Sequence, residues 1–368
     1  MARIGLEARS LSTLGGGVRR YTVEVISRIL TSASDKFIVY YDSKKHLGTF
    51  KADQKVVPVF NPLFRIAWDY FYLPRALKKD DIDLIHYFKP ATTPFKKPLA
   101  VATMYDVIPL LHPETQTKIQ LSYWKKQLPL VAKTCAHLIT ISQSAKNDIV
   151  NLLQVEPEKI TVTPLGVDEK FKRASEEEIK AVKNKYSLNA PFFLFVGTIE
   201  PRKNVARLLK AFISISEKIP HELVIAGKWG WRYEDVKEVL ANSKAKNKIK
   251  ILSYVEGKDL VPLYSAADVF VFPSLYEGFG LPPLEALACG TPVITSNISS
   301  LPEAVGTNGI LIDPNNVESI ANAMLNLAQD EVVKKNLAIK GIEWAKNFTW
   351  EKTANLTLEV YNKVLGRS

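Results

Sequence analysis

The chain has 368 residues and a formal net charge of +11; 46% of its residues are hydrophobic, 24% are charged, and the mean hydropathy is −0.03. This length and composition predict a globular protein of two domains and argue against long disordered regions. No apolar run approaches the roughly 20 residues that a membrane-spanning helix needs, and the amino terminus shows no apolar signal-peptide region.

The positive charge is unevenly distributed. Residues 1–170 contain 24 Lys and Arg against 16 Asp and Glu, whereas the remainder contains 25 against 22. An excess of positive charge favours anionic partners such as phosphates, acidic lipid or nucleic acid. The two cysteines, Cys135 and Cys289, are too far apart to indicate a disulfide framework or a metal site, which favours the reducing cytoplasm.

Short β-branched runs alternate with helical stretches along the whole chain. We predict seven strands in the first half and six in the second, at RIGLEA, FIVYY, VVPVF, LIHYF, LAVATMYD, HLITIS and ITVTPLG, then at FFLFVG, ELVIAG, KIKILSY, VFVFPS, PVITS and GILID. Continuous apolar strands separated by helices predict parallel sheets covered on both faces. The expected fold class is therefore α/β, with two Rossmann-like, doubly wound domains facing a central cleft.

Domain boundaries follow from the loss of this strand–helix rhythm. We expect an amino-terminal domain at 1–168 and a polar linker with a solvated helix at 169–190. A second domain is expected at 191–345. The amphipathic stretch 346–368 is expected to be a final helix that packs back on the first domain.

A glycine cluster, Gly15–Gly17, follows the first predicted strand and precedes a predicted helix. Glycine lets the backbone approach a ligand, and a helix start offers N–H groups to an anion. The spacing is not the dinucleotide-binding pattern, and ordinary turns also use glycine. Arg19 and Arg20 lie in the first turn of that helix, where the helix dipole disfavours each cation by roughly 0.3–1 kcal/mol.

A second basic pair, Arg202 and Lys203, directly precedes a helix that Asn204 is expected to cap. Glu200 could pair with one of these cations, which would make the pair structural. Two basic pairs at two helix starts, one in each domain, nevertheless favour a strongly negative ligand between the domains.

A third turn contains two glutamates within YEGFGLPPLE, 276–285. Pro282 is expected at the helix cap and Pro283 at the first helical position, which makes Glu285 third. A capping box is the usual structural role of such a glutamate, but Pro282 has no N–H for it to accept. A carboxylate also suits a vicinal diol of a ribose or a sugar ring, and Glu277 could hold another hydroxyl pair.

This stretch resembles the glutamate-seven-residues-glutamate motif of the family 4 retaining glycosyltransferases. VGTIEPRKN, residues 263–306 and ILIDP are similar to the donor-binding half of that family, and GGGVRRYT is similar to its glycine loop. The resemblance covers most of the chain and implies the two-domain GT-B fold. Within the family, the chain looks most like mannosyltransferases that build bacterial polysaccharides, lipopolysaccharide included.

The resemblance implies that the domain at 1–168 is the acceptor-binding domain and that the domain at 191–345 is the nucleotide-sugar-binding domain. It also implies a role for each motif. Arg202 and Lys203 would neutralise the nucleotide diphosphate, and Glu285 would bind the ribose. Glu277 would hold the transferred sugar. The donor site would be completed by backbone amides and by close glycine approach, at Phe279, Gly280, Leu281, Gly16 and Gly17. Fixed cations and amides would then stabilise the leaving group, so no metal or other cofactor is expected.

The implied reaction is retaining transfer of a hexosyl unit, with mannosyl from GDP-mannose as the first choice, to a saccharide or lipid-linked saccharide acceptor. A UDP- or dTDP-sugar donor and a sugar-nucleotide epimerase on the same fold are the enzymatic alternatives. A basic nucleic-acid-binding protein is the non-enzymatic alternative, but it rests on charge alone.

One segment departs from the family pattern. Relatives commonly have His-Asp where this chain has Tyr105 and Asp106, and a tyrosine is no base near neutral pH. Asp106 is the candidate for positioning the acceptor hydroxyl, and an ordinary turn aspartate is the alternative. His112 is a weaker acceptor candidate.

Two further signals are ambiguous or set aside. Asp81 and Asp83 have a metal-binding spacing, but they precede a buried strand, and we expect them to be structural. WDYFYLPRALKK and IQLSYWKKQLPLVAK combine aromatics with lysines, which is typical of helices that touch an anionic membrane and also of helices that cover a sheet. Exposure of Lys125 and Lys126 beside Trp124 is expected for the membrane alternative, which would place the enzyme at the cytoplasmic face of the inner membrane.

Overall fold

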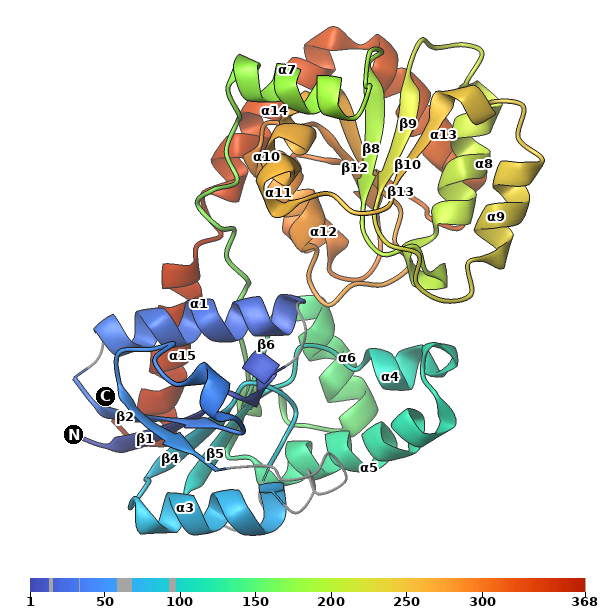
Figure 1. Ribbon diagram of the computed structural model, residues 1–368. Helices are drawn as coiled ribbons and strands as arrows, with labels where there is room; N and C mark the ends of the chain where they lie inside the picture. The colour runs from blue at the N-terminus through green and yellow to red at the C-terminus, as the bar shows by residue number, and fades with distance from the viewer. Residues whose placement is uncertain (13–15, 33, 58–67, 93–96, 368) are drawn as a thin grey trace. The chain divides into compact units, whose positions relative to one another are not determined.

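The computed structural model describes residues 1–12, 16–32, 34–57, 68–92 and 97–367 (Figure 1). The chain forms two compact units. Unit 1 comprises residues 1–166 and 349–368, and unit 2 comprises residues 167–348.

Unit 1 is built on a seven-stranded sheet in the order β3-β2-β1-β4-β5-β6-β7, and every neighbouring pair is parallel. The strands are β1 (Arg3–Glu7), β2 (Lys36–Tyr41), β3 (Asp53–Val56), β4 (Leu84–Tyr87), β5 (Leu99–Thr103), β6 (His137–Thr140) and β7 (Ile160–Val162). All seven predicted strands are present. The third begins three residues before the predicted run VVPVF, and residues 58–60 of that run lie outside the described residues; Pro58 lacks the N–H that a ladder needs, which favours a strand that ends before it.

Helices cover both faces of this sheet. The helices of unit 1 include α1 (Gly17–Ser32), α3 (Leu73–Lys79), α4 (Ile108–Leu111), α5 (Lys118–Thr134), α6 (Gln143–Leu153) and α15 (Trp350–Val364). Apolar residues of α3, α5 and α6 share one core cluster with Ile85 and Tyr87 of β4. Side chains alternate along a strand, so His86 faces the other side, where it contacts Tyr361 of α15.

The carboxyl-terminal helix is an integral part of unit 1. Trp350 and Tyr361 of α15 are buried, and Trp350 packs edge-on against Tyr21 of α1. A Cβ on Gly166 would meet the backbone nitrogen of Trp350 at 2.3 Å, so only glycine fits where the segment after β7 passes the start of α15.

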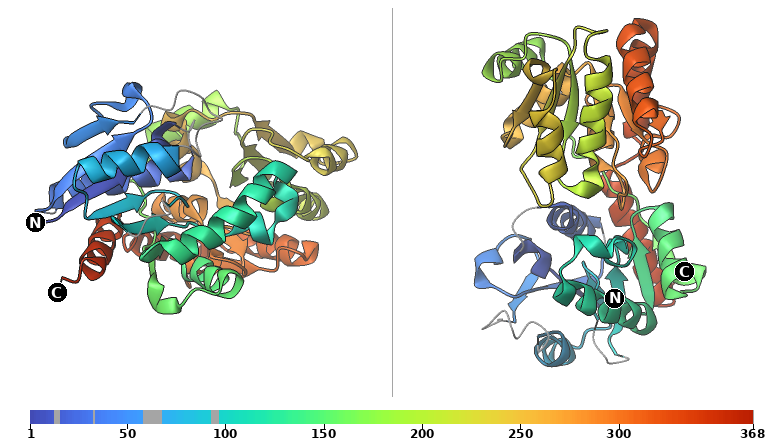
Figure 2. Two further views of the ribbon diagram at one scale, coloured as in Figure 1. Left: turned by 90° about the horizontal axis from the view of Figure 1, so that it is seen from below. Right: turned by 90° about the vertical axis from the view of Figure 1, so that its right-hand side faces the viewer.

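Unit 2 has a six-stranded sheet in the order β10-β9-β8-β11-β12-β13, again with parallel neighbours. Its strands are β8 (Phe192–Val196), β9 (Glu222–Ala226), β10 (Ile249–Leu252), β11 (Val269–Phe272), β12 (Val293–Ser296) and β13 (Ile310–Ile312), which are the six predicted ones. The sheet is flanked on both faces by helices (Figures 1 and 2), namely α7 (Glu176–Lys185), α8 (Val205–Ile215), α9 (Glu234–Ala241), α10 (Gly257–Ala266), α11 (Leu281–Ala288), α12 (Leu301–Val305), α13 (Val317–Gln329) and α14 (Glu331–Ala345).

The segment expected to be a linker, 169–190, contains α7 and groups with unit 2. Ser175 and Glu178 form a capping box at its start, and Ile179 and Val182 are buried. The segment is packed because its helix has an apolar stripe that α10 covers. In the described part of the chain, no helix is long and apolar enough to span a bilayer.

Candidate functional site

Two turns of unit 2 follow the carboxyl ends of the paired strands β8 and β11. After β8, a short 3-10 turn, Pro201–Lys203, precedes α8. After β11, a loop continues to Gly280, which precedes α11. The N–H of Leu275 donates to the carbonyl of Arg202 (2.8 Å), so the two turns are joined directly. Carboxyl ends of parallel strands are where such sheets bind ligands.

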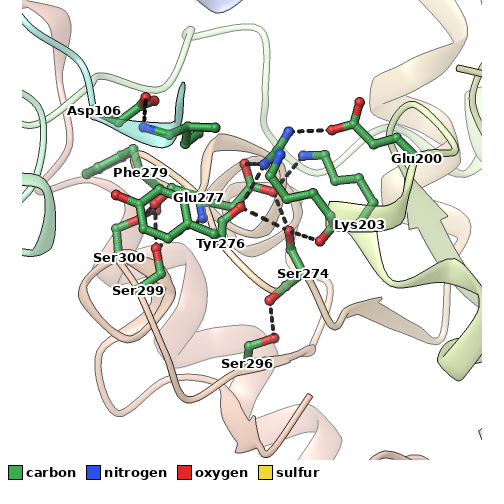
Figure 3. Close-up of polar contacts among 12 residues, drawn as sticks. Asp106, Glu200, Lys203, Ser274, Tyr276, Glu277, Phe279, Ser296, Ser299 and Ser300 are labelled. Carbon is green, nitrogen blue, oxygen red and sulfur yellow. Dashed lines mark hydrogen bonds and ion pairs between the residues drawn. The ribbon is translucent and has the colours of Figure 1, made fainter. Parts of the chain in front are cut away.

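Four charged side chains meet between these turns (Figure 3). Lys203 Nζ lies 2.6 Å from Glu277 Oε1, and Arg202 Nη1 lies 2.9 Å from Glu277 Oε2. Arg202 Nη2 contacts Glu200 Oε1 at 2.6 Å. Each of the four side chains is at most 17% exposed. The cluster therefore holds two positive and two negative charges in a largely desolvated place.

These contacts change one argument from the sequence. A basic pair at a helix start in each domain favoured an external negative ligand, and pairing of one cation with Glu200 was the structural alternative. In the structure Glu200 pairs with Arg202, and Glu277 pairs with both Arg202 and Lys203, so the basic pair at this turn does not by itself require a ligand.

Burial and pairing also set the ionisation of the cluster. Burial alone raises the pKa of Glu277, but the charges of Lys203 and Arg202 and the hydrogen bonds from Lys203 and Ser274 outweigh it, so the pKa lies below its ordinary value. Burial lowers the pKa of Lys203, and neighbouring Arg202 adds to that effect against the opposing charge of Glu277.

Serine side chains hold the loop that carries Glu277. Ser274 Oγ donates to Glu277 Oε1 (2.6 Å). Ser299 Oγ accepts from the Glu277 N–H (3.0 Å) and donates to its carbonyl (2.6 Å), while Ser300 Oγ donates to the carbonyls of Glu277 (2.8 Å) and Phe279 (2.5 Å). These serines were not predicted from the sequence; the polar cluster SNISS at the carboxyl end of a buried strand was the available signal.

The start of α11 differs from the prediction. Gly280 is the cap residue, with φ +125°, and the helix begins at Leu281, so Pro282 and Pro283 occupy the second and third helical positions. Glycine tolerates this φ, and prolines fit the first turn because its N–H groups lack helical partners. Of the first three helical residues, only Leu281 has an amide N–H to offer, in addition to those of Phe279 and Gly280 before the helix.

Glu285 consequently occupies the fifth helical position, not the third. Its side chain is buried, and Tyr264 Oη donates to its Oε2 at 3.3 Å. Glu285 thus lies two residues beyond the third helical position that a capping box uses, and Pro283 occupies that position, so this helix start has no capping box.

Asn204 precedes α8 as expected, but its side chain does not cap the helix. It has left-handed backbone angles, with φ +61°, and its amide donates to the carbonyls of Pro273 (3.0 Å) and Pro314 (2.7 Å). Asn204 therefore ties the β8 turn to the loop after β11, while its Oδ1 accepts from Arg207 of α8 (2.9 Å).

In unit 1, the helix α1 begins at Gly17, and Arg19 and Arg20 lie in its first turn as predicted. Gly16 has φ +96°, which favours glycine. Among the described residues, no atom lies within 4 Å of a Cβ built on Gly16 or Gly17, so both backbones border open space. Gly15 lies outside the described residues.

The acceptor candidates follow β5. Tyr105 Oη donates to the Phe88 carbonyl (2.9 Å), and burial raises the pKa of Tyr105 well above its ordinary value, which makes it still less suited to act as a base. Asp106 Oδ1 accepts from the N–H of Ile108 (3.0 Å), a turn role that leaves the acceptor role a prediction. His112 Nδ1 lies 3.1 Å from Glu114 Oε1.

Asp81 and Asp83, which we expect to be structural despite their metal-binding spacing, differ in their surroundings. Asp83 accepts from the N–H of Arg3 (2.8 Å), and Asp81 is exposed. Within the described ranges, no group of three or more His, Cys, Asp and Glu side chains has a metal-binding arrangement.

The ambiguous helix α5 shows both expected features. Lys125 and Lys126 are exposed, while Trp124 is partly buried against the core of unit 1. The helix therefore covers the sheet with one face and presents lysines on the other.

Comparison with known proteins covers both units. A family model described as Glycosyl transferases group 1 matches residues 175–344, and one described as Glycosyltransferase Family 4 matches residues 15–171. O-antigen chain mannosyltransferase B of Escherichia coli is 33% identical over 286 residues, which cover 77% of this chain and 75% of that protein.

A second sequence relative and one solved structure show the same likeness. The serotype-specific mannosyltransferase WbdA of Escherichia coli is 30% identical over 73% of this chain, but the match spans only 34% of WbdA. The crystal structure of a glycosyltransferase from Rickettsia africae superposes with a TM-score of 0.76 at 20% identity, covering 100% of this chain and 99% of that one. The structural likeness confirms the predicted GT-B fold.

Proposed function

This chain belongs to glycosyltransferase family 4, and we propose that it transfers a mannosyl unit from GDP-mannose, with retention of configuration, to a saccharide or lipid-linked saccharide acceptor in bacterial polysaccharide assembly. The sugar is proposed from relatives named as O-antigen mannosyltransferases. The observation that carries the proposal is the meeting of Arg202, Lys203 and Glu277 at the carboxyl ends of β8 and β11.

In this proposal the cations and the glutamates divide the donor between them. Arg202 and Lys203 bind the diphosphate and stabilise the charge that develops on it as the glycosidic bond breaks. Glu277 accepts hydrogen bonds from sugar hydroxyls, and Glu285 accepts them from the ribose. Amides at 279–281 complete donor binding by unit 2. In unit 1, the family resemblance alone assigns the glycine backbone at Gly16 and Gly17 to the donor and Asp106 to the acceptor hydroxyl. Since side chains and amides supply the compensating charge, transfer should need no metal.

A nucleotide panel tests the donor. Thermal unfolding is measured with GDP, UDP, dTDP and ADP; a ligand at 100 times its dissociation constant should stabilise the protein by about 2.7 kcal/mol. We expect GDP to give the largest shift and GDP-mannose to support transfer in the presence of EDTA. Stabilisation by UDP or dTDP instead would reassign the donor, and release of free sugar without an acceptor would indicate an epimerase.

We also propose peripheral contact with an anionic membrane at the cytoplasmic face, through unit 1. Phe71 is 57% exposed and Met1 93% exposed beside a cavity of about 1110 Å³, which Arg75, Lys78 and Lys97 also line. Exposed aromatic and basic side chains on one surface suit a bilayer of acidic lipid. Sedimentation with acidic vesicles, but not with neutral ones, is expected, and a double substitution of Arg75→Glu and Lys78→Glu should reduce it. Equal sedimentation with both lipids would reject the proposal.

A further inference from the structure

We infer that Glu277 acts as an internal competitor for the donor diphosphate: it neutralises Arg202 and Lys203 itself, and it engages the sugar only after the diphosphate has displaced it. The inference rests on the proposed function and specifies how the same site distinguishes its substrate.

The first step is that one carboxylate engages both proposed phosphate-binding cations. Glu277 Oε1 lies 2.6 Å from Lys203 Nζ, and Oε2 lies 2.9 Å from Arg202 Nη1. Arg202 Nη1 also donates to the carbonyl of Tyr276 (2.7 Å), and Nη2 donates to Glu200 (2.6 Å). A diphosphate that contacts both cations from the side that Glu277 now occupies must therefore take the place of its carboxylate.

Charge balance leads to the same conclusion. Glu200 and Glu277 together cancel the two cations, and the cluster is largely desolvated. Adding a diphosphate without moving an acid would place an excess of negative charge in a site of low dielectric, where like charges repel strongly. Glu200 contacts Arg202 alone, whereas Glu277 contacts both cations, so Glu277 is the acid whose displacement frees both.

The loop is built so that the carboxylate can turn while its backbone stays fixed. Ser299 and Ser300 hold the N–H and the carbonyl of Glu277, as described above. Ser299 has φ +60°, a conformation that residues other than glycine rarely adopt and that surrounding contacts must enforce. A side chain that rotates about this anchor gives up the two cations and the hydrogen bond from Ser274 (2.6 Å), and the diphosphate compensates the cations for that loss.

The site therefore recognises the two parts of the donor in a fixed order, the diphosphate first and the sugar second. The Glu277 carboxylate becomes available to sugar hydroxyls only when the diphosphate holds Arg202 and Lys203. A sugar without a diphosphate cannot displace it, because hydroxyl groups do not compete with a carboxylate for two cations. The site thereby discriminates against free sugars before any sugar-specific contact forms.

The test compares the neutral isostere Glu277→Gln with Asp313→Asn. Asp313 is exposed after β13, it contacts neither cation, and its substitution changes net charge equally. The probe is inorganic pyrophosphate, titrated by calorimetry at the same pH for all variants, with GDP as a second probe. We expect Glu277→Gln to bind pyrophosphate at least about tenfold more tightly than the unmodified protein while losing transfer, and Asp313→Asn to be unchanged.

Unchanged or weaker binding of pyrophosphate by Glu277→Gln overturns the inference while leaving the proposed function intact, provided that the unmodified protein binds GDP. Equal tightening in Asp313→Asn also overturns it, since net charge would then be the cause. If the unmodified protein binds neither probe, the proposed function fails and the inference fails with it.

Glu277→Gln leaves Lys203 buried without a counter-charge, which destabilises the fold. Glu277→Asp is the companion variant, because it keeps a negative charge beside Lys203. Aspartate keeps the charge but is one methylene shorter and cannot reach both cations. It should bind pyrophosphate more tightly than the unmodified protein, by less than Glu277→Gln. If only Glu277→Asp folds, binding equal to that of the unmodified protein rejects the inference.

Discussion

At the scale of single residues, Glu285 shows how one carboxylate can serve both structure and binding. It is 7% exposed at the fifth position of α11 and accepts the hydroxyl hydrogen of Tyr264. A buried carboxylate with a second oxygen can accept from a ribose diol while the tyrosine orients the first. Separate substitutions of Glu285 and Tyr264 distinguish the contribution of the carboxylate to donor binding from the contribution of the tyrosine hydroxyl to the orientation of that carboxylate.

Glu285→Ala should weaken donor binding while the fold survives. The buried Tyr264 hydroxyl loses an acceptor, which costs about 1–3 kcal/mol of unfolding free energy. The matched variant Tyr264→Phe keeps the carboxylate and should reduce GDP affinity less. Calorimetric titration with GDP and thermal unfolding measure the two effects, and unaltered GDP affinity in folded Glu285→Ala would remove this residue from the donor site.

The residues that could be predicted from the sequence are those whose chemistry is unusual where they stand. Arg202, Lys203 and Glu277 were identified because charged residues flanked glycine- and proline-rich turns. Ser299 and Ser300 were missed because their role depends on the contact between their loop, after β12, and the loop that carries Glu277. Serine is also common in turns of any kind. The partnership between Lys203 and Glu277 was likewise invisible, since 74 residues separate them and only the parallel pairing of β8 with β11 brings them together.

At the scale of elements, two interior strands of the unit 1 sheet, β4 and β6, each carry a buried histidine. His86 of β4 contacts Thr103 (2.9 Å) and Tyr361 (2.6 Å), and burial lowers its pKa to about 3. His137 of β6 contacts Thr161 (2.8 Å), and burial, aided by nearby lysines, lowers its pKa to about 4. Both side chains remain neutral in the folded sheet at pH values where they would be charged in the unfolded chain.

Unit 1 should therefore lose stability as the pH falls below about 6.5. Between the ordinary histidine pKa and the lowered folded values, the unfolded chain binds more protons, so the free energy of unfolding decreases with falling pH. One pKa unit corresponds to about 1.4 kcal/mol, and the two histidines together account for several kcal/mol by about pH 4. Hydrogen exchange of β4 and β6 across this range measures the loss.

The control for this pH dependence is His86→Gln, which keeps a hydrogen-bonding side chain but cannot titrate. It should be less stable than the unmodified protein near pH 7 and show a shallower decline toward pH 4. An equally steep decline in His86→Gln would assign the pH dependence to other groups.

Strands were the most predictable elements because apolar β-branched runs of parallel sheets are distinctive. Helix starts were less predictable. The rule that prolines mark a helix cap placed α11 two residues too late, because Gly280 provided a conformation that allowed the helix to begin before both prolines. The solvated appearance of 169–190 concealed an apolar stripe of only two buried residues, Ile179 and Val182.

At the scale of the whole molecule, the chain leaves unit 1 after residue 166 and returns to it at residue 349. The returning segment is bound by charge as well as by packing. Arg28 of α1 contacts Glu351 (2.5 Å), and Lys363 donates to the carbonyl of Glu158 (2.9 Å). Unit 1 is therefore discontinuous in sequence, and its stability depends on residues made after unit 2.

Truncation after Phe348 should unfold unit 1 and spare unit 2. The deletion removes the buried Trp350 and Tyr361 and leaves His86 without its Nδ1 partner, and loss of large buried aromatic side chains costs about 3–5 kcal/mol each. A chain ending at Val364 is the matched control, because it removes the contact of Arg367 with Asp35 but keeps α15. Hydrogen exchange should show loss of protection in β1 to β7 for the first variant, with β8 to β13 protected, and near-normal protection throughout for the second. Retained protection of β4 and β6 in the shorter chain would mean that α15 is not required for the fold of unit 1.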